Sequence, residues 1–179
     1  MKRAVLVNGV PASGKTIVAR AVSLRFGWPL FELDAIKEPF FTELGVGDRA
    51  YNRKLGRAAY AAIFNTIAAF PDPQTVVIEA WFGFQPEELL HQHLAHAGVS
   101  ETVQFWCQTS AEVIGRRYAE RVPIRPAGHP GLEYVPELIA LAGRAQPLSA
   151  GPVLSIDTNG PLDFVAVDRF LADAGFLSS

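Results

Sequence analysis

Residues 9–16 read Gly9-Val10-Pro11-Ala12-Ser13-Gly14-Lys15-Thr16 and match the pattern G-x-x-x-x-G-K-[ST] without a gap. A loop that wraps phosphate points successive backbone N–H groups inward, which requires glycine wherever a side chain would collide or the dihedrals are unusual. In such a loop Lys15 reaches the β and γ phosphates, and the hydroxyl of Thr16 ligates Mg²⁺. The motif therefore predicts that residues 9–16 together bind a nucleoside triphosphate, either ATP or GTP.

The sequence on both sides of this loop has the context that the motif requires. Residues 3–8 include the apolar run Val5-Leu6-Val7, which is typical of a parallel strand buried on both faces. Residues 15–26 carry apolar side chains at helical spacing, so a helix begins at Lys15 and directs its positive end toward the anion. We therefore interpret the loop as the P-loop of a nucleotide-binding protein.

Further along the chain, short apolar runs alternate with helical segments. We expect strands at residues 29–33, 75–80, 102–107 and 153–156, and helices at residues 34–41, 48–70, 86–97, 110–121, from 136 and at 162–174. Residues 122–134 hold three prolines and two glycines, which favours a loop. Alternating strands and helices form right-handed βαβ units. The sequence thus predicts one three-layer α/β domain over residues 1–179, with a five-stranded parallel sheet.

Composition limits the class of partner and the location. Hydrophobic residues make up 49% of the chain, enough for a substantial core, and the formal net charge of -2 gives no general attraction to nucleic acid or acidic membrane. The single cysteine, Cys107, lies in an apolar run and can form no internal disulfide. No apolar run has the length of a membrane helix or a signal peptide. We therefore expect a cytoplasmic protein without membrane or nucleic-acid partners; its oligomeric state is unknown from the sequence.

Two acidic residues follow predicted strands. Asp34 comes after the second strand and Glu79 ends the third. Ligands of open α/β sheets bind beyond the carboxyl ends of the strands, so both carboxylates are expected to face the phosphates. We expect Asp34 to orient or deprotonate an attacking hydroxyl and Glu79 to hold Mg²⁺ through water, with the reverse assignment left open. The alternatives are a helix N-cap for Asp34 and a solvent-exposed charge for Glu79.

Four arginines gather just before the Pro- and Gly-rich loop and within it: Arg116, Arg117, Arg121 and Arg125. Arg117 and Arg121 are one turn apart on one helix face. Arginines on a mobile cover stabilise the charge that collects on a phosphoryl group during transfer. We expect a lid at about residues 110–135, with catalytic Arg117 and Arg121 and with Arg125 toward the acceptor. The alternative is a solvated helix face.

Other candidates for the acceptor side are Lys37, Arg57 and Trp81. Trp81 either lines an acceptor pocket or packs in the core. Arg57 belongs to a basic set within residues 49–57, which either grips an anionic acceptor or forms a solvated helix face. The histidines of residues 91–96 lack the cysteine or carboxylate partners of a metal site, so Mg²⁺ is the only metal that we expect.

Several segments resemble the predicted P-loop kinases that are often labelled AAA-family ATPases. They are the phosphate loop, Asp34-Ala35-Ile36-Lys37-Glu38, Leu55-Gly56-Arg57-Ala58-Ala59-Tyr60, Val77-Ile78-Glu79-Ala80-Trp81-Phe82, the spaced Arg117 and Arg121, and Ile156-Asp157-Thr158. The wider group is similar in design to chloramphenicol phosphotransferase, polynucleotide kinase and zeta toxin. The resemblance covers nearly the whole chain and implies a nucleoside-monophosphate-kinase-like fold, with strand order 2-3-1-4-5 and a lid after the fourth strand.

The resemblance also implies roles for single residues. Asp34 would be the acceptor-activating carboxylate, Glu79 the Walker-B-like acid, and Arg117 and Arg121 the lid arginines, of which Arg117 also contacts the nucleotide. Asp157 and Thr158 would lie near the adenine. One departure concerns the lid, which often carries an Arg-His-Pro-Gly run; here Gly128 precedes His129-Pro130-Gly131, and the nearest arginine is Arg125.

Two functions are compatible with this pattern. The first is a kinase that moves the γ-phosphoryl group of ATP to a hydroxyl of a small molecule, with ATP and Mg²⁺ as cofactors. ATP is preferred over GTP because of the resemblance and because the chain has no Asn-Lys-x-Asp motif. The second is a nucleotide-dependent switch or slow ATPase that acts through a protein partner.

Overall fold

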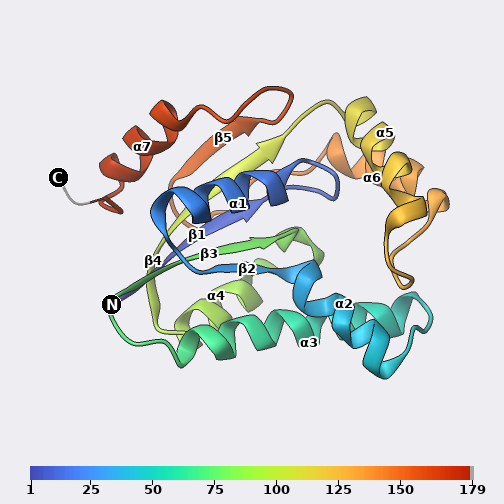
Figure 1. The fold of residues 1–179 in the computed structure, drawn as a ribbon, viewed down its shortest axis with the longest axis horizontal. Helices are drawn as coiled ribbons and strands as arrows, with labels where there is room; N and C mark the ends of the chain where they lie inside the picture. Colours follow the sequence, from blue (N-terminus) through green and yellow to red (C-terminus); the bar gives the residue numbers. More distant parts are fainter. Residues whose placement is uncertain (178–179) are drawn as a thin grey trace.

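Five parallel strands form the centre of the molecule in the computed structural model, which describes residues 1–177 (Figure 1). The sheet has the order β2-β3-β1-β4-β5, which confirms the predicted fold class and strand order. All four pairings between neighbouring strands are parallel. The strands are β1 (Lys2–Asn8), β2 (Leu30–Glu32), β3 (Gln74–Ala80), β4 (Val99–Gln108) and β5 (Val153–Asp157).

Helices cover both faces of this sheet and make it the middle of three layers (Figure 1). On one face lie α1 (Lys15–Phe26) and α7 (Phe164–Asp173), and on the other lie α3 (Arg49–Ala68) and α4 (Glu87–His96). The remaining helices, α2 (Leu33–Leu44), α5 (Ala111–Arg121) and α6 (Val135–Ala142), lie beyond the carboxyl ends of the strands. None of the helices in residues 1–177 combines the length and the hydropathy that crossing a bilayer requires.

The central strand β1 explains the continuous apolar run in the sequence. Ala4 and Leu6 pack into the core beneath α3 and α4, whereas Val5 and Val7 pack beneath α1 and α7. All four are fully buried, because successive side chains of a strand point to opposite faces and both faces are covered. Packing on both faces therefore holds β1 in place up to Asn8, and the phosphate loop begins from a fixed position.

Most predicted elements have ends that differ by one or two residues from the observed ones, and the predicted loop at 122–134 contains two short 3-10 helices, Val122–Ile124 and Leu132–Tyr134. Two elements differ by three residues at one end. The strand β4 begins at Val99 rather than at 102, because its first residues extend the pairing with β1 at Lys2. The helix α2 continues past the predicted end at 41 to Leu44, although Pro39 lies inside it and removes one backbone donor. Phe40 and Phe41 pack onto neighbouring elements and hold this last turn in place.

Candidate functional site

The phosphate loop starts at the carboxyl end of β1, and close packing explains two of its glycines. A side chain at Gly9 would overlap the Ser13 hydroxyl and the carbonyl of Cys107. Gly14 has a positive φ of 88° and lies against the Thr158 side chain, where a Cβ would come within 2.9 Å. Both positions are therefore restricted to glycine by the way the loop folds back on β4 and on the segment after β5.

The start of α1 offers donors that the protein itself does not satisfy. Gly14 occupies the N-cap position, and no side chain of residues 1–177 caps the helix. The first N–H groups of a helix have no intrahelical acceptor, so these donors point outward with the positive end of the helix dipole. The hydroxyl of Ser13 is buried and has no hydrogen-bond partner in the described part of the chain. This set of unpaired donors fits the phosphate groups of a nucleotide.

The two polar residues that end the motif share one buried carboxylate. Lys15 Nζ lies 3.2 Å from Glu79 Oε1, and the Thr16 hydroxyl donates to the same oxygen at 3.4 Å. Glu79 ends β3 beside the loop and is only 3% exposed, so the alternative of a solvent-exposed charge is wrong. The donor set of Thr16 and Glu79 fits a hydrated Mg²⁺, which prefers oxygen ligands and retains several waters.

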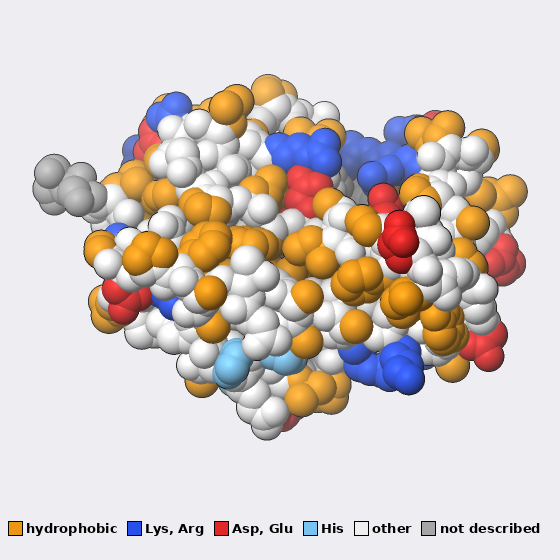
Figure 2. Space-filling model, turned by 60° about the horizontal axis from the view of Figure 1, so that its bottom comes forward, with side chains coloured by type: hydrophobic (Ala, Val, Ile, Leu, Met, Phe, Trp, Pro, Cys, Tyr) orange, Lys and Arg blue, Asp and Glu red, His pale blue; other side chains and the backbone are white. Residues whose placement is uncertain are grey.

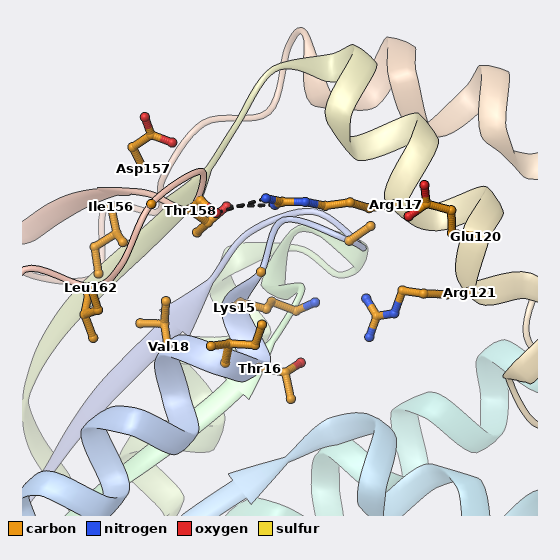
Figure 3. Close-up of a pocket in the computed structure, with 14 residues that line it drawn as sticks. Lys15, Thr16, Val18, Arg117, Glu120, Arg121, Ile156, Asp157, Thr158 and Leu162 are labelled. Atoms are coloured by element: carbon orange, nitrogen blue, oxygen red, sulfur yellow. Dashed lines mark hydrogen bonds between the residues drawn. The ribbon is translucent and has the colours of Figure 1, made fainter.

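A cavity of about 400 Å³ opens beside the loop. Figure 2 shows Lys and Arg side chains around a hollow, with acidic side chains next to them. In the close-up of the cavity, Arg121 reaches from α5 toward Lys15 and Thr16 (Figure 3). Apolar side chains of Val18, Ile156 and Leu162 lie at the opposite end of the cavity (Figure 3). One end of the cavity is thus lined by positively charged side chains, and the apolar lining of the other end suits the planar ring of a nucleotide.

Arg117 also lines this cavity, but its guanidinium is already hydrogen-bonded to Thr158 (Figure 3). Its guanidinium donates to the Thr158 hydroxyl and to the Thr158 carbonyl, both at 3.0 Å. The Thr158 hydroxyl in turn donates to the carbonyl of Ser13 at 2.8 Å. Thr158 therefore links the base of the predicted lid to the phosphate loop. Asp157 borders the cavity too, but its carboxylate accepts from the backbone and side-chain nitrogens of Asn159.

Asp34 lies in the first turn of α2, at the carboxyl end of β2. The N-cap position of this helix is Glu32, so the alternative reading of Asp34 as an N-cap is wrong. Its carboxylate accepts from Lys37 Nζ at 2.7 Å and from Arg125 Nη2 at 3.0 Å. Burial opposes ionisation of Asp34. The positive charge of Lys37, with smaller effects of Lys15 and His129, outweighs burial and holds the pKa of Asp34 well below its usual range. Asp34 is thus ionised and within electrostatic reach of the phosphate-loop lysine.

The loop after α5 lies against α2 through a second contact. His129 Nε2 lies 2.8 Å from Glu38 Oε1, and the imidazole meets the Phe41 ring edge to face. The His129 side chain is only 4% exposed. Gly128 has a φ of 103° and lies so close to the Phe41 ring that a Cβ would come within 2.9 Å. Two contacts one helical turn apart, at Asp34 and Glu38, therefore join this loop to α2.

Three solved structures with this architecture are described as kinases. A "putative kinase" from Chloroflexus aurantiacus has a TM-score of 0.80 and 28% identity, covering 97% of this chain and 98% of that one. An unliganded sugar kinase from a Janibacter species has a TM-score of 0.64 at 17% identity, with 98% and 97% covered. A gluconokinase from Sinorhizobium meliloti has a TM-score of 0.57 at 20% identity, with 96% and 91% covered. The chain has the fold of these kinases. No protein-family model and no curated protein sequence matches it.

Within residues 1–177, two of the predicted acceptor residues, Trp81 and Arg57, form no hydrogen bond or ion pair with Asp34. Trp81 packs beside Trp106, at 6.3 Å between ring centres, and against the apolar cluster that joins the phosphate loop to α5 and α6. Its contact with an acceptor stays a prediction. Arg57 is exposed on α3 and forms no ion pair within residues 1–177. Lys37 and Arg125, in contrast, both reach Asp34.

The sequence interpretation missed Asn8, which is fully buried. Its side-chain oxygen accepts from the backbone N–H groups of Gly9 and Phe82, at 2.8 and 3.3 Å. Its amide nitrogen donates to Gln104 Oε1 at 2.8 Å. The Asn8 side chain thus fixes the position of the first residue of the phosphate loop relative to the turn after Glu79. A polar residue at the end of an apolar strand was the available signal.

Replacing Asn8 with Ala is expected to lower the free energy of unfolding by about 2 kcal/mol or more, since each orphaned buried donor costs about 1–3 kcal/mol. Urea unfolding followed by circular dichroism measures the change. Asn65→Ala is the matched control because Asn65 is exposed on α3 and its hydrogen bond to His96 Nε2 is exposed too, so it should shift stability by less than about 0.5 kcal/mol. Equal losses in the two variants would contradict the bridging role of Asn8.

The contribution of His129 to the stability of the protein is expected to fall in acid. Burial and then Lys37 lower the pKa of His129 below 6.5, and Arg125 adds to this against the opposing effects of Asp34 and Glu38. A base whose pKa is lower in the folded chain takes up protons on unfolding. Its contribution to stability is therefore complete above about pH 6.5 and is lost as the pH falls toward the lowered pKa. Asp34 does not contribute to the pH dependence of stability in this range, because its pKa is held well below the usual value of an aspartate.

Thermal unfolding at about pH 5.5 and about pH 7.5 tests this expectation in the range where histidine titrates. Acidification should lower the Tm of the parent protein more than that of His129→Gln, which cannot titrate. The same Tm change in both proteins would show that His129 is not the group responsible.

Proposed function

We propose that this protein is an ATP-dependent kinase that transfers the γ-phosphoryl group to a hydroxyl of a small-molecule acceptor. One observation carries the proposal: the carboxylate of Asp34, held by Lys37 and Arg125, lies just after β2, at the carboxyl edge of the sheet where the phosphate loop also begins. A loop that only binds nucleotide needs no carboxylate there, whereas a kinase needs one for its acceptor. The kinases with the same fold support the same class of reaction.

In this proposal the nucleotide lies along the cavity beside α1. Backbone donors of residues 9–16 and Lys15 bind the phosphates, while Ile17, Val18 and Leu162 contact the base. Arg117 lies over the same end of the cavity and is held in position by Thr158. The apolar lining is compatible with adenine, and ATP is the proposed nucleotide.

The transfer step needs positioning and charge stabilisation more than covalent chemistry. The acceptor oxygen forms a bond to the γ-phosphorus, the bond from that phosphorus to the β,γ-bridging oxygen breaks, and ADP leaves. The hydroxyl proton passes to Asp34 and then to solvent. The side chains of Lys15 and Arg121 point toward one another across the cavity (Figure 3), so both can stabilise the charge on the oxygens of a phosphoryl group bound between them. Mg²⁺, held by Thr16 and through water by Glu79, would neutralise charge on the β and γ phosphates when bound.

Consumption of ATP by the purified protein with Mg²⁺ tests the proposal. The protein is assayed alone and with pools of aminoglycosides, chloramphenicol-like drugs, nucleosides, sugars and nucleotide-sugars, with Lys15→Ala as the blank. A kinase shows turnover that one pool stimulates, and mass spectrometry detects the phosphorylated acceptor. Binding of ATP with slow turnover that no pool stimulates would favour a nucleotide-dependent switch. Absence of ATP binding would contradict both functions.

A further inference from the structure

Both oxygens of the Asp34 carboxylate are engaged by cations in the structure. Lys37 donates to Oδ1 and Arg125 donates to Oδ2. A carboxylate held by two cations is a weak base, because the cations favour its charged form. The arrangement observed here therefore differs from the one in which Asp34 receives the proton of an acceptor hydroxyl.

The two cations are more enclosed than the carboxylate that they hold. The exposed fraction is 15% for the Lys37 side chain and 19% for Arg125, against 46% for Asp34. Each also lies near an aromatic ring, Lys37 at 5.6 Å from the centre of Phe41 and Arg125 at 5.5 Å from that of Tyr118. Removing the anion from two enclosed cations is costly, so they need a negative partner throughout the reaction.

One other carboxylate lies close to Asp34. The ligand atoms of Asp34, Glu38 and His129 all lie within 4.8 Å of one another, and Glu38 is engaged by His129. Within residues 1–177, Asp34 is the only carboxylate that forms an ion pair with either Lys37 or Arg125. As long as Glu38 stays with His129, the negative charge that releases Asp34 comes from a bound molecule.

We propose that the acceptor is a hydroxylated anion, which carries a carboxylate or a phosphate in addition to the hydroxyl that is phosphorylated. This inference rests on the proposed kinase function and specifies its substrate class. The anionic group binds Arg125 and Lys37 in place of Asp34, and the released carboxylate then accepts a hydrogen bond from the hydroxyl. Carboxylate and phosphate both match the fork of donors on a guanidinium. A neutral polyol offers no such charge and leaves Asp34 bound to both cations.

Matched pairs of acceptors test the proposal by isothermal titration in the presence of saturating AMP-PNP, which keeps the phosphate loop filled. One pair is D-gluconate and D-glucitol, and the other is D-ribose 5-phosphate and D-ribose. The charged member of at least one pair should bind about 10-fold or more tightly than its neutral partner, as expected for charge-assisted hydrogen bonds. The comparison between the two pairs tells a carboxylate from a phosphate.

Substitutions of Arg125 and Lys37 test whether these two cations cause the preference for charged acceptors. Arg125→Met and Lys37→Met should each weaken binding of the charged member by about 10- to 100-fold, with little change for the neutral member. Arg125→Lys retains the charge and should recover part of the loss. Arg116→Met is the matched control, because Arg116 is 65% exposed on α5 and lies 4.0 Å from Glu120, away from Asp34. It should leave binding unchanged within about twofold.

Three results would overturn the proposal: equal binding of charged and neutral members, no binding of either, or the same loss in Arg116→Met as in Arg125→Met. Turnover with Mg²⁺ and ATP separates this failure from failure of the kinase function. If neutral acceptors are phosphorylated as well as charged ones, the kinase activity stands and the anion site fails. If charged members bind in the expected pattern without forming a phosphorylated product, the anion site stands and the kinase activity fails.

Discussion

Asp34→Asn is expected to lower kcat by about 10²- to 10⁴-fold, the range for loss of a positioned general base. The amide has nearly the same shape but cannot accept the hydroxyl proton. Binding of ATP, which depends on residues 9–16, should change by less than about threefold, because Asp34 reaches the phosphates only through the field of Lys15. Steady-state turnover with an acceptor, together with titration of ATP, separates these two quantities.

Asp48→Asn is the matched control for this substitution. Asp48 caps α3 by accepting from the backbone N–H of Tyr51, and Asn serves as well as Asp at such a position. The control should retain kcat. A nucleotide-dependent switch, in contrast to a kinase, would hardly respond to Asp34→Asn, and unchanged turnover in that variant would remove Asp34 from the mechanism.

Lys15→Ala is expected to lower kcat by about 10²- to 10³-fold, as for loss of one preorganised group that stabilises charge in the transition state. It should also weaken ATP binding, because the ammonium group contacts the phosphates in the ground state as well. Turnover and equilibrium binding of ATP measure the two effects. Lys54→Ala is the control, since Lys54 is an exposed residue of α3.

Loss of Lys15 has a second consequence that distinguishes it from loss of a surface lysine. Glu79 is nearly fully buried, and Lys15 is the only cation that forms an ion pair with it within residues 1–177. Removing one partner of a buried ion pair leaves the other charge unpaired and costs about 3–5 kcal/mol. The Tm of Lys15→Ala should therefore lie below that of the parent protein, whereas Lys54→Ala should follow the parent. Equal Tm values of all three proteins would contradict the pairing of Lys15 with Glu79.

Elements with a local cause were predictable from the sequence. The run Val5-Leu6-Val7 identified a strand buried on both faces, and Asp48 and Ser110 marked helix starts that the structure contains. The predicted end of α2 at 41 was wrong, because Phe40 and Phe41 pack onto neighbouring elements and hold a further turn as far as Leu44. Local propensity decides such boundaries only where tertiary contacts do not oppose it.

The phosphate loop, the five-stranded parallel sheet and the candidate acids at the strand ends were determined by the sequence itself. Each depends on near neighbours along the chain: glycines beside a buried strand, a helix start after the loop, and a carboxylate where an apolar run stops. Only the tertiary structure decided which residues meet across the site. Arg125 and His129 contact Asp34 and Glu38 over a separation of 91 residues in each case, and Asn8 joins two loops that the sequence keeps apart. Such pairings follow from how α2 and the loop after α5 pack at one edge of the sheet, and the spacing of residues along a chain carries no record of that.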